Sequence, residues 1–433
     1  MRHAGAAPAT RRRWLAGVTA AAGAAWLGAC GRPGAAPAGR AAASLWFTYG
    51  GRNRATLEEL VARFNASQPD FWIRAVFQGD YFEGLAKLRT AIAARADPGL
   101  SHVVGEVIPY LAEAGALRSL AGLPGARELD LVAALGQSGS WRGGADRPLV
   151  ALPFNRSTPI AYLNQAVFDE HGLRAPESWA ELRESARALT RREGGRTVRY
   201  GFGCPVDWWF WVALVGQAGG EVIEPDGAVT LGGDAGVRAV ELWQRLVTED
   251  ASMKPPPGRD YNAWEATNQD FLAGRTAMIW TSTAFLRYLE ENARFPVRAA
   301  PLPRDVRHAV PTGGTHWILP ARGPDAERAA AWAFLRWMHE PAQAADWATR
   351  TGYIPVTHGA IARLEAQGFY TAHPNDRVAL RQLDVALPWP WAPALFRVQR
   401  EIVQPRLERA VLASGSAREL LEEARGIARR ELG

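Results

Sequence analysis

The sequence predicts an α/β protein with two lobes. Residues 43–49, 71–77 and 101–107 are short apolar runs typical of strands. Residues 56–65 and 82–96 carry apolar side chains at helical spacing. Strands that alternate with helices favour βαβ units and sheets rich in parallel strands. The chain has 433 residues, which is too long for one hydrophobic core and suits two.

The same alternation continues along the rest of the chain. Further strands are predicted at 159–163, 198–203 and 276–280. Further helices are predicted at 207–218, 235–248, 325–338 and 341–351, with two more starting near 395 and 417. The prolines and tryptophans of 388–393 predict a rigid loop between them.

The first thirty residues have the pattern of an export signal: arginines, a short apolar run, then small residues. The apolar run 16–29 is shorter than the roughly 20 residues that a membrane span needs. Arg11-Arg12-Arg13-Trp14-Leu15 resembles a twin-arginine signal, and Leu27-Gly28-Ala29-Cys30 resembles a lipobox, whose cysteine is lipidated. We therefore expect residues 1–30 to be a signal and Cys30 to anchor the protein in the periplasm or on the outer face of the cell membrane. Residues 31–43, mostly Gly, Pro and Ala, are expected to form a flexible tether.

Charge and cysteine content exclude several classes of protein. Four arginines lie in residues 1–29, so the formal net charge of +6 falls to +2 without the signal. We see no cluster of basic residues, which argues against a nucleic-acid partner. If Cys30 carries a lipid, Cys204 has no disulfide partner and is expected to be a packing residue. Of the 18 tryptophans, many are expected in the core and some along a cleft.

Patterns for catalysis and cofactors are absent or incomplete. Neither Lys87 nor Lys254 follows a glycine, so there is no phosphate-binding loop of the P-loop type. Gly201-Phe202-Gly203 starts like a dinucleotide fingerprint, but Val206 stands where its third glycine belongs. The eight histidines have no metal-ligand spacing. We therefore expect no enzyme activity, no cofactor and no metal.

Several segments, in order along the chain, together resemble one known family. They are Arg63-Phe64-Asn65-Ala66, Phe77-Gln78-Gly79-Asp80-Tyr81, Pro153-Phe154-Asn155-Arg156-Ser157-Thr158-Pro159, Gly274-Arg275-Thr276-Ala277-Met278, Thr312-Gly313-Gly314, Thr351-Gly352-Tyr353-Ile354-Pro355-Val356-Thr357 and Gln367-Gly368-Phe369-Tyr370. The set resembles extracellular solute-binding protein family 1, and within it the sn-glycerol-3-phosphate-binding subunits of ABC importers. That family also holds maltose-type sugar binders.

The resemblance implies a fold, a function and partners. The fold is the two-lobed periplasmic-binding-protein fold, type II-like, with a hinge and a cleft between the lobes. We expect the first lobe in residues 44–156 and about 283–340, and the second in 157–282 and about 341–433. The function is that of a monomeric receptor that binds a small phosphorylated polyol or sugar and docks on the permease subunits of an ABC importer.

The resemblance also carries ligand positions onto this chain. The ligand set it implies is Tyr81, Glu106, Ser157, Trp208, Trp211, Ser282, Gly314, Tyr353 and Arg400. In this set Tyr81 and Glu106 meet the glycerol end, and Ser282, Gly314, Tyr353 and Arg400 hold the phosphate. Arg400 fits the family's spacing better than Arg397 does. The pair Trp208 and Trp211 is implied to pack over the ligand.

The chemistry of a phosphate ligand asks for these residue types independently. A phosphate anion that leaves water needs a shell of donors, among which arginine gives the strongest geometry. Serine and tyrosine hydroxyls add donors, and a glycine lets a backbone N–H come close. Plainer roles remain open: Gly313-Gly314 as a turn, Ser282 as a helix cap, Trp208 and Trp211 as core residues. Two other functions also remain open, a neutral oligosaccharide receptor and a lipid-anchored glycerophosphodiester hydrolase.

Overall fold

The structure is a computed structural model. It describes residues 36–143, 147–224, 227–255, 260–412 and 415–432. The predicted export signal and Cys30 lie outside these residues. No helix in these ranges is long and apolar enough to cross a membrane.

The first lobe is built on a five-stranded sheet with the order β2-β1-β3-β11-β4. Its strands are β1 (Ala41–Phe47), β2 (Phe71–Phe77), β3 (Leu100–Val104), β4 (Leu152–Ser157) and β11 (Gly313–Ile318). β1 pairs with β2 and β3 in parallel, whereas β11 runs antiparallel to β3 and β4. β1 begins at Ala41, two residues before the predicted strand start, so residues 41–43 belong to the strand and not to the predicted tether.

The second lobe is built on a sheet with the order β6-β7-β8-β5-β9. Its strands are β5 (Pro159–Asn164), β6 (Arg191–Glu193), β7 (Arg196–Gly203), β8 (Thr276–Ser282) and β9 (Val297–Ala300). β7 and β8 are parallel, and the other pairings are antiparallel. A small parallel pair, β10 (Val310–Pro311) with β12 (Ala386–Leu387), lies apart from both sheets.

Both sheets are therefore mixed, which corrects the expectation of sheets rich in parallel strands. The physical reason lies in how the chain crosses between the lobes. β4 ends at Ser157 and β5 starts at Pro159, so the chain passes from one sheet to the other through Thr158 alone. It returns between β9 and β11, and such returning strands add antiparallel neighbours to an otherwise parallel βαβ pattern.

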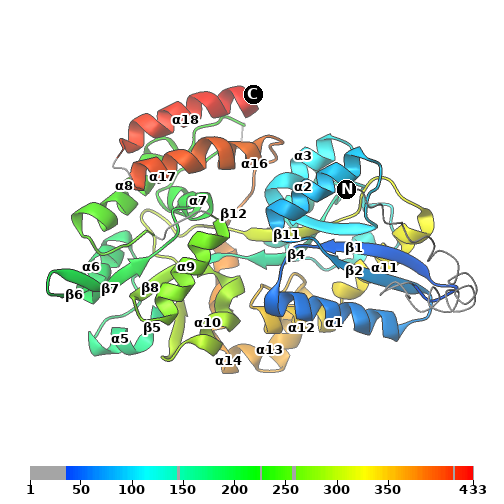
Figure 1. The fold of residues 1–433 in the computed structure, drawn as a ribbon, viewed down its shortest axis with the longest axis horizontal. Helices are drawn as coiled ribbons and strands as arrows, with labels where there is room; N and C mark the ends of the chain where they lie inside the picture. The colour runs from blue at the N-terminus through cyan, green and yellow to red at the C-terminus, as the bar shows by residue number, and fades with distance from the viewer. Residues whose placement is uncertain (1–35, 144–146, 225–226, 256–259, 413–414, 433) are drawn as a thin grey trace, which may run out of the picture.

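The helices cover the outer faces of the two sheets, which occupy separate halves of the molecule (Figure 1). The helices between β1 and β5 are α1 (Gly51–Ser67), α2 (Tyr81–Ala93), α3 (Ile108–Glu113) and α4 (Ala133–Gly136). Those between β5 and β9 are α5 (Gln165–Glu170), α6 (Trp179–Leu189), α7 (Trp208–Gln217), α8 (Gly233–Gln244), α9 (Asp260–Leu272) and α10 (Leu286–Asn292). Those after β11 are α11 (Asp325–Met338), α12 (Pro341–Thr351), α13 (His358–Ala366), α14 (Phe369–Ala372), α15 (Pro374–Arg381), α16 (Leu395–Arg397), α17 (Gln404–Leu412) and α18 (Ala417–Leu432).

The predicted lobe boundaries differ from the packing in two places. The sequence assigns 283–340 to the first lobe, whereas β9 pairs with β5 in the second sheet. The sequence assigns 341–433 to the second lobe, whereas α12 packs against α1, and Arg350 donates to Glu59 at 2.6 Å. These contacts join segments that are more than a hundred residues apart, so no local sequence pattern predicts them.

Each lobe has its own apolar core rich in aromatic rings. In the first lobe, the Phe154 ring stacks between Trp317 and Trp347, with centroids 3.9 and 4.8 Å away. In the second lobe, Trp211 and Trp243 are fully buried. Large rings bury much apolar surface each, which is how two modest sheets obtain stable cores.

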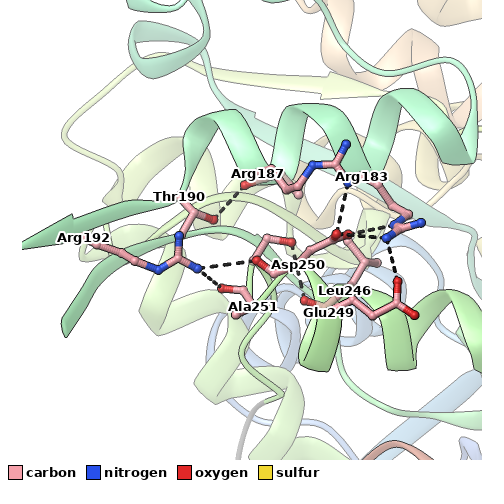
Figure 2. A network of polar contacts seen from close by, with 10 residues as sticks. Arg183, Arg187, Thr190, Arg192, Leu246, Glu249, Asp250 and Ala251 are labelled. Atoms are coloured by element: carbon pink, nitrogen blue, oxygen red, sulfur yellow. Dashed lines mark hydrogen bonds and ion pairs between the residues drawn. The ribbon is translucent and has the colours of Figure 1, made fainter. Parts of the chain in front are cut away.

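Away from the lobe interface, an ion-pair network ties α6 to the helical turn that follows α8, at Glu249 and Asp250 (Figure 2). Arg183 donates to both carboxylate oxygens of Asp250 at 2.7 and 2.9 Å, and Arg187 adds a third bond at 3.0 Å. Burial pushes the pKa of Asp250 up, but the hydrogen bonds from Arg183 and Arg187 outweigh it and lower that pKa. The network stabilises the second lobe, and none of its residues lies at the lobe interface.

Candidate functional site

A cavity of about 230 Å³ lies between the two lobes and is lined from both. Its first-lobe wall comes from the ends of β3 and β4, the start of β11 and the first turn of α2. Its second-lobe wall comes from the first turn of α7, the end of β8, α9 and the segment 396–404. Carboxyl ends of strands and amino ends of helices thus face one space, which is where α/β folds place ligands.

Eight of the nine predicted ligand residues line this cavity. They are Tyr81, Glu106, Ser157, Trp208, Ser282, Gly314, Tyr353 and Arg400. In sequence they span more than 300 residues and come from both lobes. A wider groove of about 600 Å³ lies on the first lobe between α2 and α3, but residues of that lobe alone line it.

Trp211 is the predicted residue that does not line the cavity, which corrects that expectation. Its side chain is fully buried, and its Nε1 donates to the Gly236 carbonyl at 3.2 Å. The spacing of three does place it beside Trp208, with ring centroids 5.3 Å apart. However, α7 is buried on every side, so the neighbour of a wall residue lies in the core behind it.

The aromatic wall has other members that the sequence did not single out. Trp209 and Trp264 line the cavity with ring centroids 5.5 Å apart, and Phe285 lies 6.3 Å from Trp264. The position of Trp209 in the first turn of a helix that starts at the lobe edge is the signal that could have found it. Trp264 and Phe285 have no such local signal.

Gly313 and Gly314 begin β11 and are not a turn. Gly314 has φ +93°, and a Cβ there would overlap the carbonyl oxygen of Asn155 in β4. A Cβ on Gly313 would come within 2.6 Å of the Trp209 ring. Only glycine lets the two strands and the tryptophan approach this closely.

The hydroxyl groups that the sequence predicts as donors belong to residues that line the cavity. Ser282 caps the helical turn that follows β8, and its Oγ accepts from Ala284 N at 3.1 Å, so its hydrogen is left for another acceptor. The Tyr353 and Tyr81 hydroxyls lie 3.5 Å apart across the cavity wall. Burial, followed by the charge of Tyr81, raises the pKa of Tyr353, so its hydroxyl stays protonated and able to donate.

The structure separates the two candidate arginines. Arg400 lines the cavity, and its guanidinium lies 3.9 Å from the centroid of the Phe82 ring, which joins the C-terminal segment to α2. Arg397 is more than half exposed and lies outside the lining. It donates to Glu431 at 2.6 and 3.1 Å and to Glu401 at 3.2 Å.

Acidic groups lie on the same cavity. Burial raises the pKa of Glu106, the charge of Arg156 opposes this rise, and the charge of Asp207 adds to it. Asp207 caps α7 by accepting from Trp209 N at 2.9 Å. Gln404 holds the same helix end, because its Oε1 accepts from Trp208 N and its Nε2 donates to Val206 O, at 2.9 and 2.7 Å. These contacts fix the tryptophan wall in position.

The variant Glu106→Gln is expected to gain stability over the natural chain as pH rises. Because folding raises the Glu106 pKa above 4.5, the folded protein holds that proton more tightly than the unfolded chain. Stability of the natural chain therefore falls as pH rises through this window, and the glutamine variant avoids the fall. Urea unfolding at pH 4 and pH 7 measures it. The same stability difference at both pH values would contradict this assignment.

A metal site or a reactive thiol requires features that the described residues do not show. The described residues contain no group of three His, Cys, Asp or Glu side chains arranged to hold a metal ion. Cys204 is fully buried, and burial raises the pKa of its thiol well above the ordinary value. The expectation that Cys204 is a packing residue is confirmed.

Two lobes, crossing segments and a cavity lined from both lobes are the features of a solute-binding protein. The sequence profile of the bacterial extracellular solute-binding protein family matches residues 59–375. The chain belongs to that family. Solute-binding proteins of this class bind small molecules outside the cytoplasm and interact with the permease subunits of ABC importers.

Relatives and solved structures agree with the predicted family and fold. The sn-glycerol-3-phosphate-binding periplasmic protein UgpB of Escherichia coli is 26% identical over 379 residues, covering 81% of this chain and 82% of that protein. Its Yersinia pestis counterpart is 24% identical over 368 residues, with the same coverage. UgpB from Mycobacterium tuberculosis, solved with glycerophosphocholine, superposes with a TM-score of 0.79 at 23% identity, over 92% of this chain and all of that one. The GacH receptor of Streptomyces glaucescens, solved unliganded and with acarbose, gives 0.80 at 20% identity, over 91% and 98%.

Proposed function

We propose that this protein is the extracytoplasmic receptor of an ABC importer for sn-glycerol 3-phosphate or a glycerophosphodiester such as glycerophosphocholine. The observation that carries the proposal is the set of donors gathered in the cavity: Ser157, Ser282, Gly314, Tyr353 and Arg400. These residues come from five separate segments of the chain. A phosphate removed from water needs such a shell, because an unpaired anion loses its solvation without replacement.

The rest of the cavity suits the remainder of such a ligand. Glu106 and Tyr81 line it and offer an acceptor and a hydroxyl to the glycerol oxygens. Trp208, Trp209 and Trp264 offer flat apolar faces to the carbon skeleton. The same rings would attract a quaternary ammonium group by about 0.5–2 kcal/mol, which suits a choline ester.

Lipid anchoring through Cys30 is part of the proposal and is supported by the Leu27-Gly28-Ala29-Cys30 pattern. Each buried CH₂ of an acyl chain contributes about 0.8 kcal/mol to membrane attachment. Fractionation of cells that express the full chain or its Cys30→Ser variant tests it, because only the variant is expected in the soluble fraction. Membrane retention of the variant would contradict the anchor.

Titration calorimetry with sn-glycerol 3-phosphate, glycerophosphocholine and maltose tests the ligand. We expect heat of binding with at least one of the two phosphates and none with maltose. Tight maltose binding without phosphate binding would overturn the proposal. Incubation of each phosphate with the protein, followed by analysis for glycerol or choline, tests the hydrolase alternative, which requires product to appear.

A neutral oligosaccharide receptor is the second candidate, and the aromatic wall favours it. Solved structures with similar folds include the acarbose complex of GacH and a maltose-bound Thermotoga maritima protein at TM-score 0.79 and 19% identity. Stacked tryptophans are a usual surface for sugar rings. Arg400 at the cavity favours the phosphate, because its planar guanidinium can donate two hydrogen bonds to a phosphate oxygen pair, which a neutral sugar does not carry.

A further inference from the structure

Behind the cavity wall lies a buried arginine that the ligand set does not include. Arg156 precedes Ser157 in β4 and is 1% exposed. Its Nη1 donates to the Gly314 carbonyl at 3.2 Å, and its Nη2 donates to Thr312 Oγ1 at 2.8 Å. The guanidinium therefore lies directly behind the strand that carries the two glycines of the wall.

The charge of Arg156 has little local compensation. Within the described ranges, its side chain bonds to a carbonyl and a hydroxyl and makes no ion pair with a carboxylate. Its Nε, also buried, has no hydrogen-bond partner there. Glu106 is the carboxylate whose charge acts on it from a distance, and Glu106 itself lines the cavity. A buried guanidinium without a direct counter-ion is costly unless an anion balances it.

His316, whose pKa the charge of Arg156 affects, does not add a competing positive charge. His316 lies on β11, the strand that Arg156 bonds to, and its Nε2 lies 3.0 Å from Ser138 Oγ. Burial, followed by the charge of Arg156, lowers the pKa of His316 well below its ordinary value, so this imidazole is neutral. Burial also lowers the pKa of Arg156, to about 10, which leaves it charged at neutral pH.

We infer that Arg156 is a specificity-determining residue of the cavity, whose buried charge behind Gly314 favours a doubly charged phosphate without touching it. The inference rests on the proposed phosphate ligand, and it assigns to Arg156 the preference for a dianion over a monoanion. Because the guanidinium is buried, its attraction for a charge in the cavity is screened less than it would be at the surface. It grows in proportion to ligand charge, so a dianion gains twice what a monoanion gains.

The test compares two ligands that differ by one methyl group and one charge. At pH 7.5, sn-glycerol 3-phosphate is close to a dianion, because the second pKa of a phosphate monoester is about 6, whereas its methyl ester is a monoanion. Calorimetry on the Arg156→Gln variant should show about tenfold weaker binding of the monoester and about threefold weaker binding of the methyl ester. Equal losses for both ligands, or no loss, would overturn the inference.

Two further variants separate charge from packing. Arg156→Lys keeps the charge but not the paired bonds, and Thr312→Val removes one bond and keeps the arginine. Both are expected to retain the affinity ratio of the natural protein for the two ligands. They also carry the test if Arg156→Gln does not fold, because loss of the ratio in Arg156→Lys would overturn the inference. If the natural protein binds maltose and neither phosphate, the proposed function and this inference both fail. If it binds phosphate but Arg156→Gln leaves the ratio of the affinities for the monoester and the methyl ester unchanged, only the inference fails.

Discussion

The Gly314→Ala variant is expected to unfold at much lower urea concentration and to lose phosphate binding. Two costs combine at this position. A non-glycine residue at φ +93° is strained by about 1–2 kcal/mol, and the new Cβ would overlap Asn155 O unless β11 moves away from β4. We expect a total loss of about 3–5 kcal/mol in the free energy of unfolding, measured by urea titration.

Gly274→Ala is the matched control for this effect. Gly274 also has positive φ, at +70°, but a Cβ there would meet nothing within 4 Å. It should lose only the conformational part, about 1 kcal/mol, and keep its ligand affinity. Equal losses for both variants would show that close approach of β11 and β4 does not matter.

The Arg400→Ala variant is expected to bind the phosphate ligand about 100-fold more weakly, a loss of about 2–4 kcal/mol. A charge-assisted hydrogen bond to a phosphate is worth more than a neutral one, and its removal leaves the anion short of a donor. Calorimetry with sn-glycerol 3-phosphate measures the change, and the melting temperature of the free protein reports any structural effect.

Arg397→Ala is the control for Arg400→Ala. Its guanidinium pairs with Glu431 and Glu401 on the surface, and surface pairs contribute about 0–1 kcal/mol. We expect unchanged affinity and a small change in stability. If Arg397→Ala weakens binding as much as Arg400→Ala does, the choice of Arg400 is wrong.

Local patterns predicted the elements well where the signal lies within the element itself. The strand Phe71–Phe77 and the helices Asp325–Met338 and Pro341–Thr351 have the predicted bounds. The periodicity of their apolar residues and the residues at their ends, such as Pro341 in a first turn, are enough to predict these elements without knowledge of distant contacts. β9 and β11 were not predicted, because their strand character depends on pairing with β5 and β4, far away in sequence.

The same distinction holds for the cavity. Residues such as Ser157, Gly314 and Tyr353 belong to segments whose resemblance to a family pointed to them, and all three line the cavity. The prediction that Trp211 lines the cavity was wrong, because helical spacing shows which residues lie side by side but not which of them faces the cavity. Arg156 lies in one of the segments that resemble the family, but nothing in the sequence shows that its side chain is buried against β11.

If Ser157 holds the ligand as proposed, the single-residue crossing from β4 to β5 would couple the strength of ligand binding to the rate at which the ligand is captured and released. Thr158 is fully buried, its hydroxyl accepts from Gln382 and its carbonyl accepts from Thr283, so the crossing is held on both sides. The wall residue Ser157 and the junction Thr158-Pro159 are consecutive. Under the proposed function, a mutation at Ser157 that changes ligand affinity is therefore expected also to change how fast the lobes open. Selection for tighter uptake at this point of the chain would be paired with slower delivery to the permease.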